Sequence, residues 1–166
     1  MQQIETERKY VILIPPREKV CQMPSFTESE ITQIYLEDDK ATHRVRKRCY
    51  PDRTEYTENT KIRISALSSI EREGKITEQE FNELSRNIQR GTHPLSKTRI
   101  TFEYDGKTIE LDRYAEWKST CIMEIELKSE DEFPSLPDFI TIIKEVTGER
   151  IYSNHSMAKC FPKELI

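Results

Sequence analysis

The sequence lacks the long apolar runs that secretion and membrane insertion require. Its 166 residues have a mean hydropathy of -0.75. Met1 leads directly into polar residues without an apolar signal core, and no stretch approaches the roughly 20 apolar residues of a membrane span. We therefore expect a soluble, cytoplasmic protein with no membrane partner.

Paired cysteines and zinc-like spacings are also missing. The four cysteines lie far apart, with no Cys-x-x-Cys pair and no histidine at the spacing of a zinc site. They are Cys21, Cys49, Cys121 and Cys160. Free thiols are expected, and neither disulfides nor a structural metal is needed to hold a chain of this length together.

A basic excess is absent too, since the formal net charge is -4. A nucleic-acid duplex is therefore a poor default partner. Seven Tyr and six Phe keep the chain outside disordered composition, although 34% of the residues are charged. No repeat or long linker divides the sequence, so residues 1–166 are expected to form a single domain.

Alternation of polar and apolar residues with a period of two dominates the chain and predicts strands. Eight strands are expected at residues 3–13, 29–36, 42–50, 55–67, 69–75, 96–104, 107–115 and 119–128. Tyr50-Pro51-Asp52 and Asp105-Gly106 are typical of hairpin turns. Closure into a barrel is favoured, because it removes the unpaired edges of an even number of mainly antiparallel strands.

Three segments have helical signals instead. Residues 77–90 begin with a Thr-x-x-Glu capping box and end at a glycine. Residues 138–146 carry an apolar stripe at helical spacing, which predicts a second helix. A short third helix is expected at residues 154–160.

Charged residues of one sign share one face of most predicted strands. Side chains two residues apart in a strand point the same way, so Glu5, Glu7 and Lys9 share a face. The other sets are Arg44, Arg46 and Arg48, Lys61 and Arg63, Glu71 and Glu73, Lys97 and Arg99, Glu110 and Asp112, and Glu124 and Glu126. Surface strands normally mix the two signs, because like charges repel at short range. The separation of positive and negative charges onto different strands therefore needs an explanation.

Two arrangements of these faces remain open. In the first, the charged faces are solvated and the apolar faces pack together in a sandwich, which is usual for alternating strands. In the second, the charged faces line a barrel, and the apolar faces look outward under the helices at residues 77–90 and 138–146. Unpaired buried charges are costly, so such an interior must be a wet, ligand-binding tunnel.

The charge chemistry of a tunnel indicates its ligands. Carboxylate clusters suit hard divalent ions such as Mg²⁺ or Mn²⁺, and rows of Arg and Lys suit phosphate oxygens. The expected phosphate contacts are Lys9, Arg44, Arg46, Lys61, Lys97 and Arg99. The expected first metal ligands are Glu5, Glu7, Glu124 and Glu126. Support for a second ion or for an attacking water is expected from Glu71, Glu73 and Asp112.

These motifs together resemble the triphosphate tunnel metalloenzymes, or CYTH superfamily, whose hallmark is Glu-x-Glu-x-Lys near the N-terminus. Glu5, Glu7 and Lys9 match that hallmark. The likeness continues through His43-Arg44-Val45-Arg46, Thr60-Lys61, Ile70-Glu71-Arg72-Glu73, Lys97-Thr98-Arg99, Ile109-Glu110-Leu111-Asp112, Met123-Glu124-Ile125-Glu126 and Tyr152-Ser153-Asn154. It spans nearly the whole chain and looks closest to the compact bacterial branch.

The resemblance implies a mainly β fold: a closed, eight-stranded antiparallel barrel with a charged interior and a few helices packed outside. It also implies metal-dependent hydrolysis of inorganic triphosphate or short polyphosphate by attack of a metal-activated water. Tyr35 falls where that branch has a tyrosine beside the tunnel, which adds it to the substrate contacts. The catalytic set is then Glu5, Glu7, Lys9, Glu71 and Glu73. No Ser, Cys or His sits in a nucleophile constellation, so no covalent intermediate is expected.

Other functions stay open at this point. The runner-up enzymes are a class IV-type adenylate cyclase and a thiamine or nucleoside triphosphatase, and the non-enzyme alternative is a polyphosphate-binding module. Ser153 and His155 stand where relatives carry lysine, and the hairpin at residues 50–56 is longer than in small relatives. Arg48 and Arg63 are interpreted as rim residues, and His155 as a capping or surface residue. Either a monomer or a homodimer is compatible with the sequence.

Overall fold

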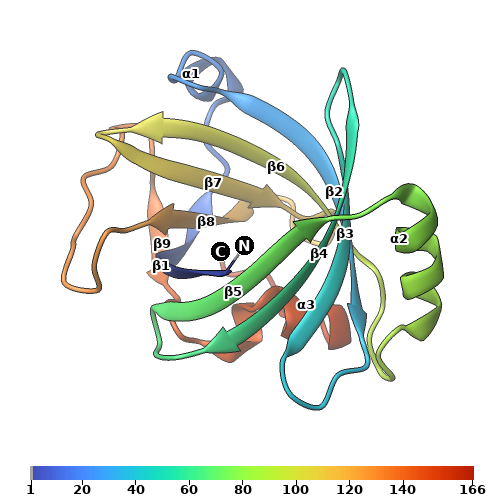
Figure 1. Cartoon of the computed structure of the whole chain (residues 1–166). Coiled ribbons are helices and arrows are strands. Elements are labelled where there is room, and N and C mark those ends of the chain that lie inside the picture. The colour runs from blue at the N-terminus through green and yellow to red at the C-terminus, as the bar shows by residue number, and fades with distance from the viewer. Residues whose placement is uncertain (1) are drawn as a thin grey trace.

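Eight long strands form the body of the protein, known from a computed structural model that describes residues 2–166 (Figure 1). They are β1 (Gln2–Leu13), β2 (Thr27–Leu36), β3 (Thr42–Cys49), β4 (Thr54–Arg63), β5 (Ser68–Lys75), β6 (Leu95–Tyr104), β7 (Lys107–Arg113) and β8 (Thr120–Glu126). Each corresponds to a strand predicted from the alternation. All eight strand predictions are therefore confirmed, with differences only at the ends.

The strands close into an antiparallel barrel. Their order is β5-β4-β3-β2-β6-β7-β8-β1, and β1 returns to pair with β5. β1 closes the barrel because its first half, Gln2 to Thr6, pairs with β5, while Glu7 to Leu13 pairs with β8. The predicted closed eight-stranded barrel is confirmed.

Two tight turns join neighbouring strands as the sequence predicts. Asp105 and Gly106 have φ values of 49° and 70° between β6 and β7. Two successive positive φ values belong to the turn type that fits the right-handed twist of a hairpin, and Asp-Gly tolerates them. Between β3 and β4, the Tyr50 N–H donates to the Arg53 carbonyl at 2.8 Å.

The main apolar core lies outside the barrel wall. Around the cavity the inward-facing positions are taken by polar side chains, so most apolar residues of β1, β6, β7 and β8 point outward and must be covered. Phe102, Met123 and Ile125 are fully buried there, packed beneath Phe139 and Ile140. The segment after β8 thus shields the outer face that a barrel with a polar interior creates.

The predicted helix at residues 138–146 is wrong. Residues 138–141 are turn or irregular chain, and Ile142–Glu145 form a ninth strand, β9, which pairs with Tyr10 to Ile12 on β1. The segment is rich in β-branched side chains, which favour strands, and β1 has a free edge beside it. Of the predicted apolar stripe, Phe139 and Val146 pack on the barrel, whereas Ile142 and Ile143 are exposed.

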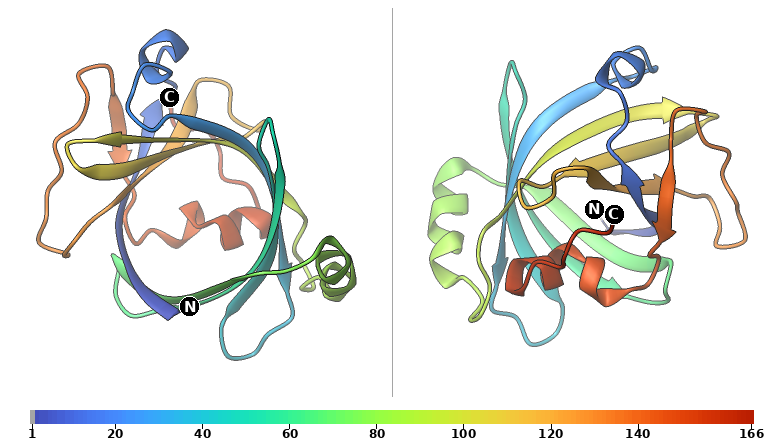
Figure 2. Two further views of the ribbon diagram at one scale, coloured as in Figure 1. Left: turned by 45° about the horizontal axis from the view of Figure 1, so that its top comes forward. Right: turned by 180° about the vertical axis from the view of Figure 1, so that it is seen from behind.

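The helices occupy two different positions. α2 (Glu78–Leu84) begins with the predicted capping box at Thr77 and packs outside the barrel, where Phe81 contacts the Tyr56 ring. It continues into the 3-10 helix η1 (Ser85–Asn87). α3 (Asn154–Lys159) follows the 3-10 helix η2 (Arg150–Tyr152). Figure 2 shows α3 lying across one end of the barrel, which we call the closed end.

One further helix, α1 (Arg17–Val20), is a single turn that the sequence analysis missed. It follows β1 and buries Val20 against the outer core. Among residues 2–166, no helix has the length and apolar character needed to cross a bilayer.

Candidate functional site

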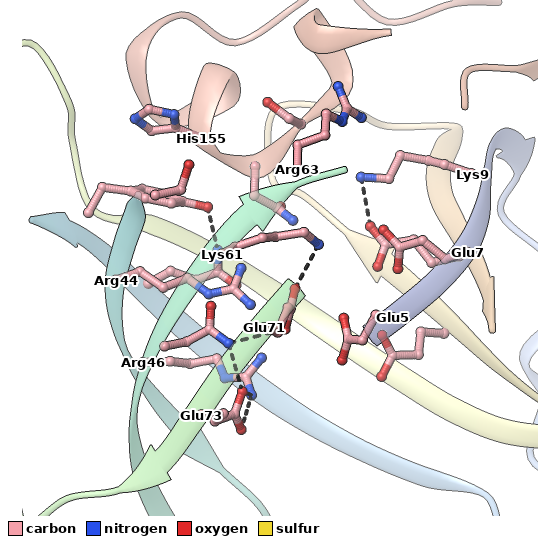
Figure 3. Close-up of a pocket in the computed structure, with 18 of the residues that line it drawn as sticks. Glu5, Glu7, Lys9, Arg44, Arg46, Lys61, Arg63, Glu71, Glu73 and His155 are labelled. Carbon is pink, nitrogen blue, oxygen red and sulfur yellow. Dashed lines mark hydrogen bonds and ion pairs between the residues drawn. The ribbon is translucent and has the colours of Figure 1, made fainter. Parts of the chain in front are cut away.

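A cavity of about 700 Å³ occupies the interior of the barrel. Its charged lining residues are Glu5, Glu7, Lys9, Arg44, Arg46, Arg48, Lys61, Arg63, Glu71, Glu73, Arg99, Glu110, Glu124, Glu126, Arg150 and Lys159. Figure 3 shows Glu5 and Glu7 on one side of this cavity and Arg44 and Arg46 on the other. The charged strand faces therefore line the interior, and the sandwich alternative is excluded.

Five carboxylates form one side of the cavity, the acidic wall: Glu5, Glu7, Glu110, Glu124 and Glu126. The strand register pairs Glu7 with Glu126 and Glu110 with Glu124. Burial and neighbouring carboxylates raise the pKa of Glu5 to about 7. Burial, followed by the charge of Glu124, raises the pKa of Glu7, and burial, followed by Glu110, raises that of Glu126. In each case burial is the largest cause, and a neighbouring carboxylate adds to it.

Two members of the acidic wall have close cationic partners: Glu110 Oε2 lies 2.5 Å from Arg99 Nη1, and Glu124 contacts two cations. Glu124 Oε1 lies 2.9 Å from Lys9 Nζ, and its Oε2 lies 3.5 Å from Arg99 Nη2. Burial alone would raise the pKa of Glu124, but Lys9 and Arg99 hold it far below its ordinary value. Burial likewise opposes the charge of Lys9, and Glu124 and Glu7 outweigh it, so its pKa is raised. Both groups are charged at neutral pH.

Four cations form the facing side, the basic wall: Arg44, Arg46, Arg48 and Lys61. Two of them contact carboxylates of β5: Arg46 Nη2 lies 3.1 Å from Glu73 Oε1, and Lys61 Nζ lies 2.7 Å from Glu71 Oε1. Burial, followed by repulsion from Arg44, lowers the pKa of Arg46. The basic wall is thus crowded with like charge, as the acidic wall is with the opposite sign.

Lys97 and Asp112 lie behind the cavity surface and do not line it. Both side chains are 1% exposed, and Lys97 Nζ lies 2.6 Å from Asp112 Oδ2. Asp112 also accepts two hydrogen bonds of 2.7 Å from Arg99, which does line the cavity. Burial, followed by repulsion from Arg99, lowers the pKa of Lys97 to about 8. The geometry makes these two residues supports of Arg99.

Several inward-facing polar atoms are buried without a partner in the described chain. They are Gln33 Oε1, Arg44 Nε, Thr57 Oγ1, Asn59 Oδ1 and Thr101 Oγ1. The register places Arg44 between Tyr35 and Asn59. Buried polar groups are nearly always hydrogen-bonded, so a group of unpartnered ones in a cavity indicates water or a ligand.

The closed end has its own polar lining from α3 and the residue before it. His155 lines the cavity, its Nε2 lies 2.6 Å from Gln89 Oε1, and its ring centroid is 4.8 Å from that of Tyr35. Burial, followed by the charge of Lys159, lowers the pKa of His155. The interpretation of His155 as a capping or surface residue is wrong, because α3 turns this side chain into the barrel.

The inward parity of the strands could have identified two more lining residues. Gln33 is two positions before Tyr35, and Asn59 is two positions before Lys61, so both share the charged face of their strands. Arg48 and Arg63 also line the cavity. His43, by contrast, is not among the lining residues, and its Nε2 lies 2.7 Å from Glu58 Oε1.

No ready-made metal centre exists within residues 2–166. No three side chains of the His, Cys, Asp and Glu types are grouped there around a common point. The acidic wall nevertheless supplies only oxygen ligands, which is the donor set of a hard divalent ion. Such ions are often held by one or two carboxylates together with phosphate oxygens of a substrate.

No protein-family model matches the sequence, and no curated protein matches it either. Several solved structures do match this chain. The inorganic triphosphatase NE1496 is 25% identical with a TM-score of 0.57, and the match covers 95% of this chain and 99% of that one.

Two further structures are similar in fold. PH1819 from Pyrococcus horikoshii OT3 is 22% identical with a TM-score of 0.55, covering 76% of this chain and 80% of that one. HpAC1 from Hippeastrum, described as an adenylyl cyclase with a dominant triphosphatase activity, is 14% identical with a TM-score of 0.51, covering 74% and 80%. At these identities the two likenesses concern the fold alone.

Proposed function

The chain belongs to the triphosphate tunnel, or CYTH, superfamily, and from this premise we propose that it hydrolyses a triphosphate with the help of a divalent metal ion. The observation that supports the proposal most is the meeting of an acidic and a basic wall in one closed barrel. Neither wall is neutralised by the other. A polyphosphate with a bound cation brings the missing partner of each.

The basic wall is the proposed binding surface for the phosphate chain. Arg44 and Arg46 can each donate two parallel hydrogen bonds to phosphate oxygens, and Lys61 adds a mobile charge. Arg44 Nε is a buried donor without a partner in the described chain, so it is free to bind a ligand. Tyr35 lies directly across the strand pair from Arg44 and supplies a hydroxyl at the same level.

The acidic wall is the proposed metal site. Burial and then neighbouring carboxylates raise the pKa values of Glu5, Glu7 and Glu126, and a cation among them would stabilise their charged forms. Glu124 is shared with Lys9 and can turn to the same ion. A divalent ion held there would draw charge from the phosphate oxygens and make a nearby water a stronger nucleophile.

Lys97 and Asp112 receive a different role from the direct contacts expected at first. Both are buried behind Arg99, and Asp112 accepts from two nitrogens of its guanidinium. We assign them to positioning: they fix the direction in which Arg99 points into the cavity. Fixed donors stabilise developing charge well, because they need no reorganisation during the reaction.

The remaining step needs only binding and orientation from the chain. Arg44, Arg46 and Lys61 hold the phosphate chain and spread the charge that develops on the transferred group. The oxygen of a water forms a bond to the terminal phosphorus, and the bridging oxygen leaves with the electron pair. The water gives up a proton, which a carboxylate of the acidic wall can accept before it passes to solvent.

Inorganic triphosphate is favoured over organic triphosphates by the lining itself. In the described chain, residues 2–166, no aliphatic, Phe or Trp side chain lines the cavity, and its only rings are Tyr35 and His155. Sites for drug-sized organic groups are predominantly apolar or aromatic. An adenine or thiazole group would therefore find little to contact inside the barrel.

A phosphate-release assay tests the proposal. Tripolyphosphate, longer polyphosphate, ATP and thiamine triphosphate are compared with Mg²⁺ or Mn²⁺ and with a chelator. We expect the fastest release from tripolyphosphate and none with the chelator. Cyclic AMP formation from ATP with no release from tripolyphosphate would support a cyclase instead. Tight binding of tripolyphosphate without turnover would indicate a binding module.

A further inference from the structure

The barrel wall has a gap beside two of its motif residues. One edge of β1 pairs with β5 from Gln2 to Thr6 and with β9 from Tyr10 to Ile12. Between these ladders the Glu7 N–H donates to the Leu67 carbonyl at 3.0 Å, but the Lys9 N–H is taken by a side chain, Thr147 Oγ1, at 3.0 Å. The Lys9 carbonyl accepts from the Val146 N–H at 2.8 Å, so the backbone ladder is interrupted at the Lys9 N–H, between the first residue of β5 and the last residue of β9.

A small second cavity lies at this gap and has a volume of about 30 Å³. Glu7, Lys9, Arg63 and Ser153 line both this cavity and the tunnel, so the two adjoin. Its outer rim includes the exposed Ala66. We call this cavity the side opening. A volume of this size holds about one water molecule and is too small for a phosphate group.

The side opening lies at the closed end of the tunnel. Ser153 is the N-cap residue of α3, the helix that lies across that end (Figure 2). A linear phosphate chain must therefore enter from the opposite end, which Figure 2 shows uncovered by any described helix. The terminal phosphate enters first and stops nearest α3.

In phosphoryl transfer the attacking and leaving oxygens lie roughly in line with the phosphorus. The leaving oxygen bridges to the rest of the phosphate chain, so it points toward the open end. The attacking water must then approach from the closed end. That end is covered by α3, and the phosphate chain itself blocks the way from the open end.

We propose that the side opening admits the attacking water to the terminal phosphate while substrate fills the tunnel. This inference rests on the proposed function. The water oxygen bonds to the terminal phosphorus and the bridging P–O bond breaks. Tripolyphosphate and water then give orthophosphate, pyrophosphate and one proton, which passes to solvent. Glu7 and Lys9 border both spaces, so they line the path of the water.

Ala66 offers a way to close the side opening without touching the tunnel. It is exposed, it is not among the tunnel-lining residues, and a Cβ built on Gly148 would lie 3.0 Å from its Cβ. Ala66→Leu should fill the narrow space between the two turns, and Ala66→Ser should leave it open. Ala115→Leu is a matched control, because Ala115 is exposed and lines neither cavity.

The test compares single-turnover hydrolysis of tripolyphosphate with its Kd from calorimetry. We expect Ala66→Leu to slow turnover by roughly tenfold, less than the roughly hundredfold cost of misplacing a reacting group. Its Kd and Tm should match those of Ala66→Ser and Ala115→Leu. Full turnover in Ala66→Leu would overturn the inference, as would a loss of affinity equal to the loss of rate. Absence of hydrolysis in the unaltered protein would instead defeat the proposed function.

Discussion

The acidic wall and the basic wall sit in the same barrel but differ in how well their charges are balanced. On the basic wall, Arg46 and Lys61 have carboxylate partners on the neighbouring strand β5. On the acidic wall, Glu5, Glu7 and Glu126 keep raised pKa values, whereas Glu110 and Glu124 have close cationic partners. The acidic wall is therefore suited to a cation, and the basic wall to an anion.

This difference explains why like charges are tolerated inside a folded chain. A buried, uncompensated carboxylate costs stability unless it takes up a proton or a cation. The raised pKa values of Glu5, Glu7 and Glu126 favour uptake of a proton, and a divalent ion would meet the same need. The basic wall keeps its charge and meets an anion.

Glu7→Gln should have the largest effect on turnover, because it removes the charge at the centre of the acidic wall. We expect a loss of roughly a hundred to a thousandfold in kcat, the cost of removing one group that stabilises charge in a transition state. Steady-state kinetics with tripolyphosphate and Mg²⁺ measure it. The exposed Glu116 provides the control Glu116→Gln. Unchanged activity in Glu7→Gln would remove Glu7 from the metal site.

Arg46→Ala should affect binding more than stability. A hydrogen bond to a charged group contributes about 1.5 to 3 kcal/mol, which corresponds to a roughly tenfold to hundredfold rise in KM. Arg86→Ala, at an exposed position outside the barrel, is the control. If thermal unfolding shows that Arg46→Ala collapses the fold, Arg46 is structural and the basic wall is smaller than described.

Glu5→Gln should change the pH dependence of stability, because Glu5 belongs to the acidic wall. Burial raises the pKa of Glu5 from its ordinary 4.5 to about 7, so the folded chain binds this proton more tightly than the unfolded chain. The resulting stability is present below pH 4.5 and is lost as the pH rises through 7. In metal-free buffer, Glu5→Gln should therefore raise Tm at pH 8 and leave it unchanged at pH 4.5.

The thermal scans also include Mg²⁺. The ion should raise the Tm of the unaltered protein at pH 8 more than that of Glu5→Gln, because the variant has lost one carboxylate of the wall. An equal response of both proteins to Mg²⁺ and to pH would show that Glu5 does not share in the repulsion.

Thr77→Ala should have the smallest effect and none on the tunnel. Thr77 caps α2 outside the barrel through a 3.1 Å bond from the Glu80 N–H. Loss of such a cap costs about 1 kcal/mol. Thermal unfolding should show this loss, and KM and kcat should stay the same. A change in KM would show that α2 affects substrate binding in the tunnel.

Much of this arrangement could be predicted because strand alternation carries two kinds of information at once. The same period of two that located the strands also placed Glu5 with Glu7 and Arg44 with Arg46 on one face each. The signs of those faces then indicated a ligand with both anionic and cationic parts. The same alternation places Gln33 and Asn59 on the inward faces of their strands, but their neutral side chains give no charge signal.

The rest depends on contacts between segments that are far apart in the sequence. Residues 142–145, within the segment predicted to be helical, form a strand, since the free edge of β1 outweighs their helical spacing. Lys97 and Asp112 have the same parity as true lining residues, yet their short mutual contact draws them behind the surface. The position of His155 follows from where α3 packs, which no local pattern reveals.

The central claim is that the two walls bind the two halves of one ligand. Titration of Mn²⁺, followed by its electron paramagnetic resonance signal, tests this with and without a non-hydrolysable imido analogue of tripolyphosphate. If the claim holds, the analogue tightens Mn²⁺ binding, Mn²⁺ tightens analogue binding by the same factor, and Glu7→Gln abolishes the coupling. Equal Mn²⁺ affinity with and without the analogue would contradict it.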